Sequence, residues 1–290
     1  MHIDGKTQLI GLLGWPVSHS FSPAMHNAAA QALDINWLYV PLPVQSQDLL
    51  NALRGLPALG FRGVNVTVPH KQKVMPFLDD VDESARAIGA VNTILIKQQS
   101  TGSGSKWILT GTNTDWVGFL TDLKRCEVKI DRRDCLVLGA GGSARAVVYG
   151  LLYNNARVHV LARRYEQAQQ LAKDFQDTGQ IETGSLADLP SCLSSLTSPL
   201  IVNTTPLGMT PKVNDSVWPD RVLFPNDAFA YDLVYNPRQT RFIRQAIRAG
   251  CRTSNGLGML IQQGAHAFEL WTGYKPDVEV MSSALNLTLY

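Results

Sequence analysis

Three small residues in the middle of the chain have the spacing of a phosphate-binding turn. Gly139, Gly141 and Ala144 fit the pattern G-x-G-x-x-G/A and follow an apolar run at 136–138. In such a turn the first glycine allows a tight bend, the second lets the backbone approach a phosphate, and the third small residue lets the helix pack on the strand. The N–H groups and positive end of that helix then face the anion. The spacing predicts a dinucleotide site, although tight strand-to-helix turns also use glycine for purely structural reasons.

Two arginines stand where a dinucleotide site selects its cofactor. About 20 residues beyond the glycine turn, an NAD site places Asp or Glu to accept hydrogen bonds from the ribose. This chain has Ala162, Arg163 and Arg164 there, and no acid until Glu166. Because guanidinium groups form bidentate hydrogen bonds with phosphate oxygens, the pair predicts NADP, whose ribose bears a 2′-phosphate. One of the two arginines is expected to be an ordinary solvated residue.

Lys71 is a candidate for proton transfer. It follows a strand pattern at 61–68, in which Asn65 and Thr67 alternate with valines and so share one face. Pro69 ends such a strand and can open a helix, which would place Lys71 in the first turn. The helix dipole disfavours a positive charge there. Lys71 is therefore either a solvated surface lysine, which is the usual case, or a lysine with a use in acid–base chemistry.

A group of hydroxyls precedes the first predicted helix, at residues 24–33. Ser22 is a good N-cap and Pro23 suits the first turn, so a capped helix explains both residues. It does not explain Ser18 and Ser20. Hydroxyls beside a helix N-terminus also form a cradle for a small carboxylate that bears hydroxyl groups. Both interpretations stay open for this segment by itself.

The elements that would position these residues alternate between strands and helices. Around the glycine turn, a helix at 146–152 and a strand at 157–161 complete one βαβ unit. A later strand from residue 200 runs into a polar turn that ends at Met209, where α/β sheets place ligand contacts. Asp115 lies 24 residues before Gly139, where the pattern of the first half of the chain ends and that of the βαβ unit begins. Thr114 or Asp115 could also simply cap a helix.

The other expected elements follow from hydrophobic periodicity and turn residues. They are strands at 9–13, 37–41 and 229–234, helices at 46–53 (with Ser46 as the cap), 167–177, 240–249 and 259–270, a hairpin with a flexible tip at 100–105, and a loop at 253–258.

Composition excludes several classes of protein. The chain has 290 residues, 45% of them hydrophobic and 17% charged, with a formal net charge of +2 and no long basic run. These values predict two globular domains and argue against disorder and against a nucleic-acid partner. The four cysteines have no metal-binding spacing, which favours reduced thiols and a cytoplasmic location. No apolar run predicts a signal peptide or a membrane span.

Seven short motifs, in order along almost the whole chain, resemble those of the shikimate dehydrogenase family. Each motif is modest alone, but seven in register make coincidence implausible. They are Ser18-His19-Ser20-Phe21-Ser22-Pro23, Asn65-Val66-Thr67-Val68-Pro69-His70-Lys71, Ala90-Val91-Asn92-Thr93, Gly111-Thr112-Asn113-Thr114-Asp115, Gly139-Ala140-Gly141-Gly142, Asn203-Thr204-Thr205-Pro206-Leu207-Gly208-Met209 and Asn255-Gly256-Leu257-Gly258-Met259-Leu260.

The resemblance implies a two-domain α/β enzyme that reduces 3-dehydroshikimate to shikimate with NADPH, in chorismate and aromatic amino acid biosynthesis. It implies no metal, and the enzyme would be a monomer or a homodimer. An α/β substrate-binding domain would comprise residues 1–114, completed by 256–290 because the C-terminal helix returns to it. A Rossmann-like NADP-binding domain would comprise residues 115–255.

By the same motifs, the catalytic pair would be Lys71 and Asp115. The residues expected to hold the substrate are Ser20, Ser22, Asn65, Thr67, Asn92, Tyr235 and Gln263. The residues expected to bind the cofactor are Gly139, Ala140, Gly141, Gly142, Ser143, Ala162, Arg163, Arg164, Thr204, Met209 and Gly256. The chain departs from the family at Ala162, where Asn is usual, and at Asn255, where Asp is usual.

Two other functions are weighed against this one. A quinate or dual quinate/shikimate dehydrogenase resembles the chain at nearly every motif; the paired hydroxyls of Ser20 and Ser22 favour shikimate over quinate. A non-catalytic NADP-binding regulator on the same fold is the second alternative, since one fold hosts many functions. The presence of both Lys71 and Asp115 argues against it, because a sensor needs neither.

Overall fold

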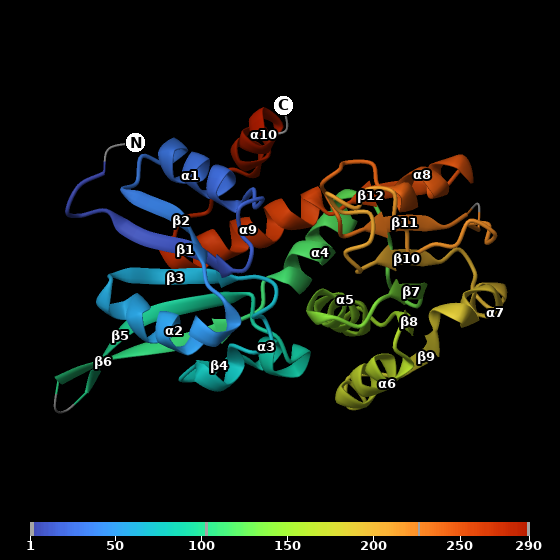
Figure 1. Ribbon diagram of the computed structural model, residues 1–290, viewed down its shortest axis with the longest axis horizontal. Helices are drawn as coiled ribbons and strands as arrows, with labels where there is room; N and C mark the ends of the chain where they lie inside the picture. Colours follow the sequence, from blue (N-terminus) through green and yellow to red (C-terminus); the bar gives the residue numbers. More distant parts are fainter. Residues whose placement is uncertain (1–2, 102–103, 226, 289–290) are drawn as a thin grey trace. The chain divides into compact units, whose positions relative to one another are not determined.

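The protein folds into two compact units. The computed structural model describes residues 3–101, 104–225 and 227–288 (Figure 1). The first unit comprises residues up to 118 together with residues from 261 onward, and the second comprises residues 119–260. The predicted limits at 114 and 255 fall a few residues earlier. They differ because the observed limits lie inside two helices, α4 (Asp115–Arg125) and α9 (Leu257–Thr272), rather than in loops.

The first unit is built on a mixed six-stranded sheet in the order β2-β1-β3-β5-β6-β4. Its strands are β1 (Gln8–Gly14), β2 (Trp37–Pro43), β3 (Phe61–Val66), β4 (Asp80–Val81), β5 (Thr93–Thr101) and β6 (Gly104–Thr112). Strands β1, β2 and β3 are parallel, whereas β5 is antiparallel to both β3 and β6. The predicted flexible tip at 100–105 is wrong in part, because Ser100 pairs with Ser105 in the hairpin ladder; residues 102–103 lie outside the described residues.

Helices cover both faces of this sheet. They are α1 (Ser22–Ala32), α2 (Leu49–Ala58), α3 (Glu83–Ile88), the later turns of α9, and α10 (Val278–Thr288), with short 3-10 turns η1 (Ser46–Asp48) and η2 (Met75–Phe77). One core cluster joins β1, β3 and β5 to Leu53 of α2 and Ala85 of α3. On the opposite face Ile10, Leu12 and Tyr39 pack against Trp271 of α9. Side chains that alternate along each strand supply both cores.

Two predicted helix caps in this unit are wrong. Helix α1 begins at Ser22 itself, and its N-cap residue Phe21 makes no side-chain cap. The Ser20 hydroxyl instead accepts the backbone N–H of Ser22, at 3.2 Å. Ser46 opens the 3-10 turn η1 rather than capping α2, and its hydroxyl accepts a hydrogen bond from Lys73.

The helix predicted to start after Pro69 does not form. Lys71 lies in a run of turns before η2. The reason is tertiary: the Lys71 carbonyl accepts the N–H of Val91 at 2.8 Å, and the His70 ring bonds the carbonyl of Val44. In a helix the Lys71 carbonyl would instead accept the N–H of the residue four positions further on. Lys71 therefore stands outside any helix dipole, and the argument from a helical first turn does not apply to it.

The second unit has a parallel six-stranded sheet in the order β12-β11-β10-β7-β8-β9. Its strands are β7 (Asp134–Leu138), β8 (Arg157–Ala162), β9 (Ile181–Ser185), β10 (Leu200–Asn203), β11 (Phe229–Asp232) and β12 (Arg252–Asn255). This is the strand order of a Rossmann sheet, so the predicted two-domain α/β fold is confirmed. Residues from 261 onward belong to the first unit, as predicted. The predicted loop at 253–258 is wrong at its start, because residues 252–255 pair with β11 as a polar edge strand.

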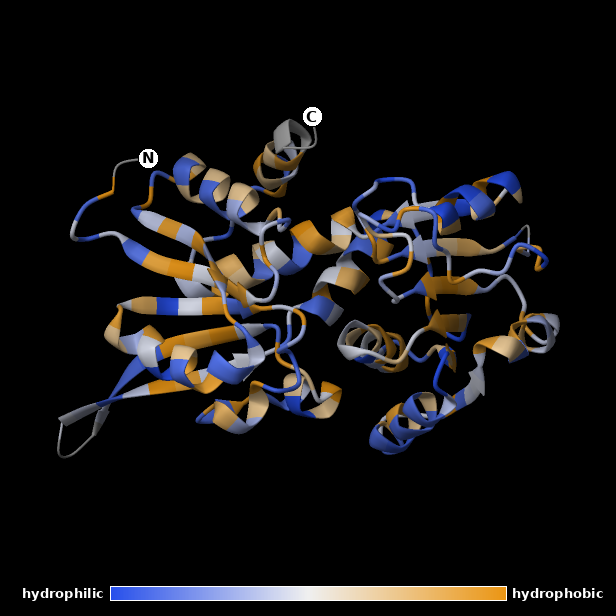
Figure 2. Ribbon diagram, in the orientation of Figure 1, coloured by the Kyte–Doolittle hydropathy of each residue, from blue (hydrophilic) through white to orange (hydrophobic). Residues whose placement is uncertain are grey.

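Two core clusters fill the two faces of this sheet. Helices α4, α5 (Gly142–Tyr153) and α6 (Tyr165–Asp174) pack on one face, around Val137 and Val160. Helices α7 (Leu189–Ser194) and α8 (Arg241–Arg248), with Trp218, pack on the other, around Leu136 and Ile201. Figure 2 shows β7, β10 and β11 mostly in hydrophobic colours and α6 and α8 largely in hydrophilic ones, as expected for helices with one buried stripe. Over the described residues, no helix has the length and apolar character to cross a membrane.

His26 of α1 is a fully buried histidine in the core of the first unit. Its ring stacks on Tyr39, with 4.2 Å between the centroids and 3° between the planes. Neither ring nitrogen has a hydrogen-bond partner among the described residues. Burial lowers the pKa of His26 to about 3, because the charged form would lose its hydration without compensation.

This burial predicts a loss of stability in acid. The pKa of His26 is near 6.5 in the unfolded chain and lower in the fold, so below pH 6.5 the unfolded state binds one more proton. Between pH 7 and pH 5 the wild type should lose about 2 kcal/mol more free energy of unfolding than His26→Phe. Urea unfolding at both pH values measures the difference, with the exposed His19→Phe as control. Equal losses in wild type and His26→Phe would contradict the prediction.

Candidate active site

An ion pair in the first unit joins the two residues predicted to be catalytic. Lys71 Nζ lies 2.6 Å from Asp115 Oδ2, although the residues are 44 positions apart. The Asp115 side chain is 6% exposed and that of Lys71 is 16% exposed. Asp115 is the first residue of α4, and Asn113 accepts its backbone N–H at 3.0 Å. A nearly buried ammonium held by a carboxylate is an arrangement that can give or take a proton.

Asn92 holds the second carboxylate oxygen of Asp115. Its Nδ2 donates to Asp115 Oδ1 at 2.8 Å, and its Oδ1 accepts the backbone N–H of Thr114 at 2.7 Å. Asn92 lies directly before β5, at the point where the Val91 N–H reaches the Lys71 carbonyl. The buried side chain of Asn92 thus lies where three segments meet: the turn that carries Lys71, the start of β5 and the start of α4.

Asn65 extends the network along β3. Its Nδ2 donates to the Thr93 hydroxyl at 3.1 Å and to the Asn92 carbonyl at 3.2 Å. The Thr93 hydroxyl also lies 3.1 Å from Asn92 Oδ1. The Oδ1 atom of Asn65 accepts the Tyr39 hydroxyl at 2.8 Å. A continuous chain of hydrogen bonds therefore runs from Tyr39 through these side chains to the Lys71–Asp115 pair.

Four members of this network were not predicted as site residues: Tyr39, Thr93, Asn113 and Thr114, whose hydroxyl lies 3.0 Å from Asn92 Nδ2. Thr93 and Asn113 stand inside two of the recognised motifs, so the signal was present, but their roles depend on partners distant in sequence. Tyr39 had no signal beyond an aromatic residue in a strand. Side-chain hydrogen bonds across a sheet follow from the register of its strands, which periodicity leaves undefined.

Gln263 reaches the network from α9. Its Oε1 lies 3.3 Å from Asn92 Nδ2 and 3.5 Å from the Thr114 hydroxyl. Gly118 of α4 makes this approach possible, because a Cβ there would lie 2.6 Å from the Gln263 backbone nitrogen. Gln263, the predicted substrate residue of the C-terminal segment, is thus in contact with Asn92.

The two predicted serines lie at the start of α1. Ser22 is 5% exposed and hydrogen-bonds the Tyr39 side chain, and Ser20 is partly exposed with its hydroxyl on the Ser22 N–H. Thr67 follows β3 and is partly exposed; its N–H donates to the carbonyl of Leu13. Ser22 is therefore linked to Asn65 through Tyr39.

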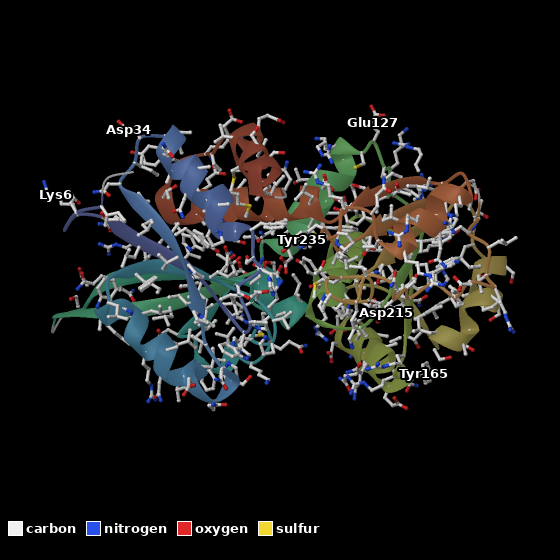
Figure 3. All side chains as sticks on the ribbon, turned by 45° about the horizontal axis from the view of Figure 1, so that its top comes forward. Lys6, Asp34, Glu127, Tyr165, Asp215 and Tyr235 are labelled. Atoms are coloured by element: carbon white, nitrogen blue, oxygen red, sulfur yellow. The ribbon has the colours of Figure 1, made fainter. Side chains whose placement is uncertain are left out.

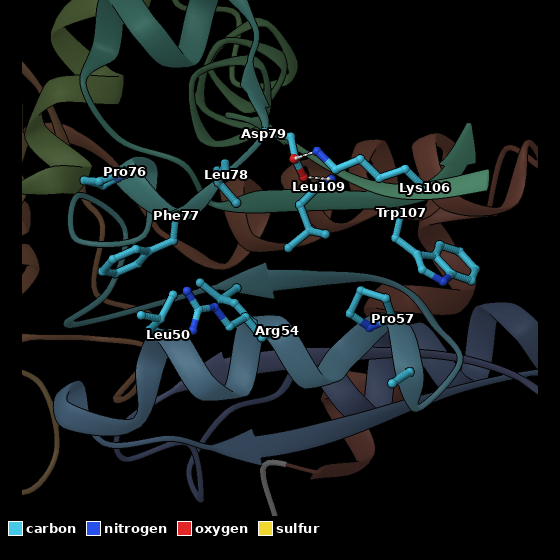
Figure 4. Close-up of a pocket in the computed structure, with 12 residues that line it drawn as sticks. Leu50, Arg54, Pro57, Pro76, Phe77, Leu78, Asp79, Lys106, Trp107 and Leu109 are labelled. Atoms are coloured by element: carbon cyan, nitrogen blue, oxygen red, sulfur yellow. Dashed lines mark hydrogen bonds and ion pairs between the residues drawn. The ribbon is translucent and has the colours of Figure 1, made fainter. Parts of the chain in front are cut away.

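One cavity of the first unit lies apart from these residues. It has a volume of about 780 Å³ and is lined by side chains of α2, the η2 region and β6 (Figure 4). Arg54, Phe77 and Trp107 line it, and Lys106 is paired there with Asp79 at 2.7 Å. None of its lining residues is a predicted site residue, so this cavity is distinct from the hydrogen-bond network.

All residues predicted to bind the cofactor lie in the second unit, at the carboxyl edge of its sheet. Because all six strands are parallel, the segments that follow them reach the same edge. Gly139 follows β7, Arg163 follows β8 and Thr204 follows β10. Gly256 follows β12, and Met209 ends the turn after β10 with 48% of its surface exposed. Tyr235, a predicted substrate residue, also belongs to this unit, just after β11, as Figure 3 marks.

The glycine turn has a geometry suited to an anion. Gly139 has φ +111°, and a Cβ there would lie 2.6 Å from Thr204 Oγ1. Thr204 in turn bonds the Leu138 carbonyl through both its N–H and its hydroxyl. Gly141 is the N-cap of α5, where no side chain caps the helix and a Cβ would meet only open space. Exposed N–H groups at the start of a long helix are the groups that hold a pyrophosphate.

The two arginines after β8 are both exposed. Neither guanidinium has a partner within the described part of the chain, and Arg164 is the N-cap of α6. Ala162, the last residue of β8, is buried. Free guanidinium groups beside the ribose end of a dinucleotide site fit a 2′-phosphate, so the second unit fits NADP on its own geometry.

A buried carboxyl group holds the turn after β10. Asp232 accepts hydrogen bonds from Asn203 Nδ2 at 2.9 Å and from the Thr240 hydroxyl. Asn203 Oδ1 then accepts the N–H and hydroxyl of Thr205. Burial raises the pKa of Asp232 to about 6, while these hydrogen bonds oppose the rise. No group of three potential metal ligands occurs among the described residues.

Three family models match the chain. The substrate binding domain of shikimate dehydrogenase matches residues 12–94, shikimate / quinate 5-dehydrogenase matches residues 122–205, and the C-terminal domain of shikimate 5'-dehydrogenase matches residues 256–285. These matches cover parts of both units.

Individual proteins are similar over nearly the whole length. The shikimate dehydrogenase (NADP⁺) of Carboxydothermus hydrogenoformans is 46% identical, over 99% of this chain and 100% of its own. The crystal structure of shikimate 5-dehydrogenase from Thermus thermophilus, in complex with NADP(H) and shikimate, is 37% identical with a TM-score of 0.84, over 98% and 100% of the two chains. A quinate dehydrogenase from Corynebacterium glutamicum in complex with NAD is 31% identical with a TM-score of 0.85, over 98% and 99%.

Proposed function

Because this chain belongs to the shikimate dehydrogenase family, we propose that it reduces 3-dehydroshikimate to shikimate with NADPH. The observation that carries the proposal is the buried Lys71–Asp115 ion pair, fixed by Asn92. The relative at 46% identity is named as an NADP-dependent shikimate dehydrogenase, which supports this activity over that of a quinate enzyme. A regulator without catalysis would have no use for such a pair.

In this proposal the first unit holds the substrate. Shikimate has one carboxylate and three hydroxyls, so its site needs several small polar groups and one anion cradle. Ser20 and Ser22 at the start of α1 are assigned to the carboxylate. The ring hydroxyls are assigned to Asn65, Thr67, Asn92 and Gln263 of the same unit. Tyr235 is assigned to the substrate on the family resemblance alone.

Lys71 is the proton donor that we assign to the reduction. The substrate carbonyl oxygen becomes a hydroxyl and needs one proton, which the Lys71 ammonium can supply; in the reverse reaction the amine takes it back. Asp115 orients the ammonium and balances its charge through their 2.6 Å contact. When bound, NADPH supplies the hydride.

The second unit is assigned to the cofactor. Gly139, Ala140, Gly141, Gly142 and Ser143 would place the N-terminus of α5 against the pyrophosphate. Arg163 and Arg164 would hold the 2′-phosphate beside Ala162. Thr204, Met209 and Gly256 follow other strands at the same edge and complete the assigned set.

The proposal extends to location and assembly. The four cysteines are free, which supports a reducing compartment, and we assign the enzyme to the cytoplasm as a monomer or a homodimer.

Substrate choice tests the proposal. We expect kcat/KM for shikimate to exceed that for quinate by at least about tenfold, or roughly 1.4 kcal/mol of differential transition-state binding. Quinate has an extra hydroxyl on the carboxylate-bearing carbon, beside the assigned Ser20 and Ser22 pair. Absorbance assays of NADP and NAD reduction, each with shikimate and with quinate, give all four values.

The four assays separate the candidate functions. A preference for quinate, or equal efficiency with both substrates, would overturn the shikimate assignment. Binding of NADP without turnover of either substrate would favour a regulator.

A further inference from the structure

We propose that Tyr39 is a positioning residue of the substrate site, whose hydroxyl fixes the orientation of the Asn65 carboxamide. The inference rests on the proposed function, because the substrate contact of Asn65 belongs to that proposal. Tyr39 is 2% exposed, and its hydroxyl donates to Asn65 Oδ1 at 2.8 Å. Burial raises the pKa of Tyr39, so its hydroxyl keeps its proton and remains a donor at neutral pH.

The partners of Asn65 leave one orientation for its amide. One of them is the backbone carbonyl of Asn92, which can only accept, so the NH₂ group must face it. The carboxamide oxygen therefore faces Tyr39, and Tyr39 must donate. Both amide protons of Asn65 are directed to Asn92 and Thr93. The group that remains for a substrate hydroxyl is Asn65 Oδ1, which can accept a second hydrogen bond.

The backbone and ring of Tyr39 are held by α1. Asn27 accepts the Tyr39 N–H at 2.8 Å and donates to its carbonyl at 2.9 Å. His26, the preceding residue of the helix, stacks on the Tyr39 ring, with an angle of only 3° between the two ring planes. Backbone and ring plane are thus both fixed, which directs the hydroxyl along one line toward β3.

The same helix begins with Ser22, which hydrogen-bonds the Tyr39 hydroxyl. Tyr39 therefore links the residue assigned to the substrate carboxylate with one assigned to a ring hydroxyl. Removal of the hydroxyl would leave a buried Asn65 oxygen without its donor and free the amide to shift. A substrate contact made equally in the ground and transition states would weaken, which raises KM more than it lowers kcat.

The test is Tyr39→Phe, which keeps the stacked ring and removes only the hydroxyl. We expect KM for shikimate to rise about tenfold, kcat to fall less than threefold, and KM for NADP to stay within twofold of wild type. The matched control is Tyr274→Phe, an exposed tyrosine of the same unit that should leave all three values unchanged. Direct binding of shikimate, measured by calorimetry, should weaken by the same factor as KM rises.

A double variant shows whether Tyr39 acts through Asn65. In Tyr39→Phe/Asn65→Ala, the rise in KM for shikimate should be smaller than the product of the two single effects. A multiplicative rise, an unchanged KM in Tyr39→Phe, or equal rises in KM for shikimate and NADP would overturn the inference. A wild type that turns over neither shikimate nor 3-dehydroshikimate would instead overturn the proposed function, so the two failures are distinguishable.

Discussion

Replacement of Lys71 with alanine should lower kcat by about 10² to 10⁴, the range for a positioned acid–base group. KM for shikimate should change much less, because the assigned proton transfer occurs in the transition state. The structural reason is the ion pair: Lys71 Nζ is held 2.6 Å from Asp115 Oδ2, in a largely buried position. Steady-state kinetics with saturating NADP and varied shikimate measure both constants.

The chain offers a matched control for this variant. Lys73 lies two residues further on, is exposed, and donates to the Ser46 hydroxyl rather than to the network. Lys73→Ala should therefore keep the wild-type kcat. A Lys71→Ala enzyme within threefold of wild-type kcat would remove Lys71 from the chemistry.

Asp115→Asn should also lower kcat, through loss of the charge that orients Lys71. An amide in place of the carboxylate would present an NH₂ group either to the Lys71 ammonium or to Asn92 Nδ2, and both of those groups are donors. The new NH₂ group at position 115 would then face another hydrogen-bond donor, whichever way the amide turns. If Asp115→Asn has wild-type kcat, the carboxylate does not take part in positioning Lys71.

The second large effect concerns the cofactor. We expect the enzyme to prefer NADP over NAD by about 10- to 150-fold, the factor that corresponds to one charged hydrogen bond of roughly 1.5–3 kcal/mol. Arg163→Ala should remove most of that preference, chiefly through KM for NADP, while the kinetics with NAD stay nearly unchanged. Arg164→Ala should do less. Both guanidinium groups are exposed after β8, and no described residue competes for either one.

Kinetics with both cofactors test this assignment. Arg248→Ala, which removes an exposed arginine from the last turn of α8, controls for the loss of one positive charge from the second unit. If the wild type uses NAD as well as NADP, or if Arg163→Ala/Arg164→Ala keeps the wild-type ratio, these arginines do not bind the phosphate.

Local sequence predicted the second unit better than the first. Its four inner strands, β7, β8, β10 and β11, are short and largely apolar, and a parallel sheet brings the segments that follow them to one edge. The βαβ pattern around Gly139 therefore predicted the position of the turn. The edge strand β12 was missed, because residues 252–255 are polar and gain their strand character only by pairing with β11.

The first unit shows where local rules fail. A cap at Ser22 and a helix after Pro69 both follow from good propensities, yet neither forms. At Lys71 the competing partner is the Val91 N–H, which lies far away in sequence. Tertiary hydrogen bonds of this kind replace the local bonds on which propensity depends.

The sequence by itself determined the two-domain α/β class, the glycine turn, the arginines after β8 and, through its motifs, the identities of Lys71 and Asp115. These features are local, since each depends on residue types within a few positions of one another. Only the tertiary structure decided that Asp115 reaches Lys71, that Asn92 fixes its second oxygen, and that Tyr39 ends the chain of hydrogen bonds at Asn65. Those contacts join β2, β3, the start of β5 and the start of α4, and they depend on strand order and register, which no periodicity within one segment defines.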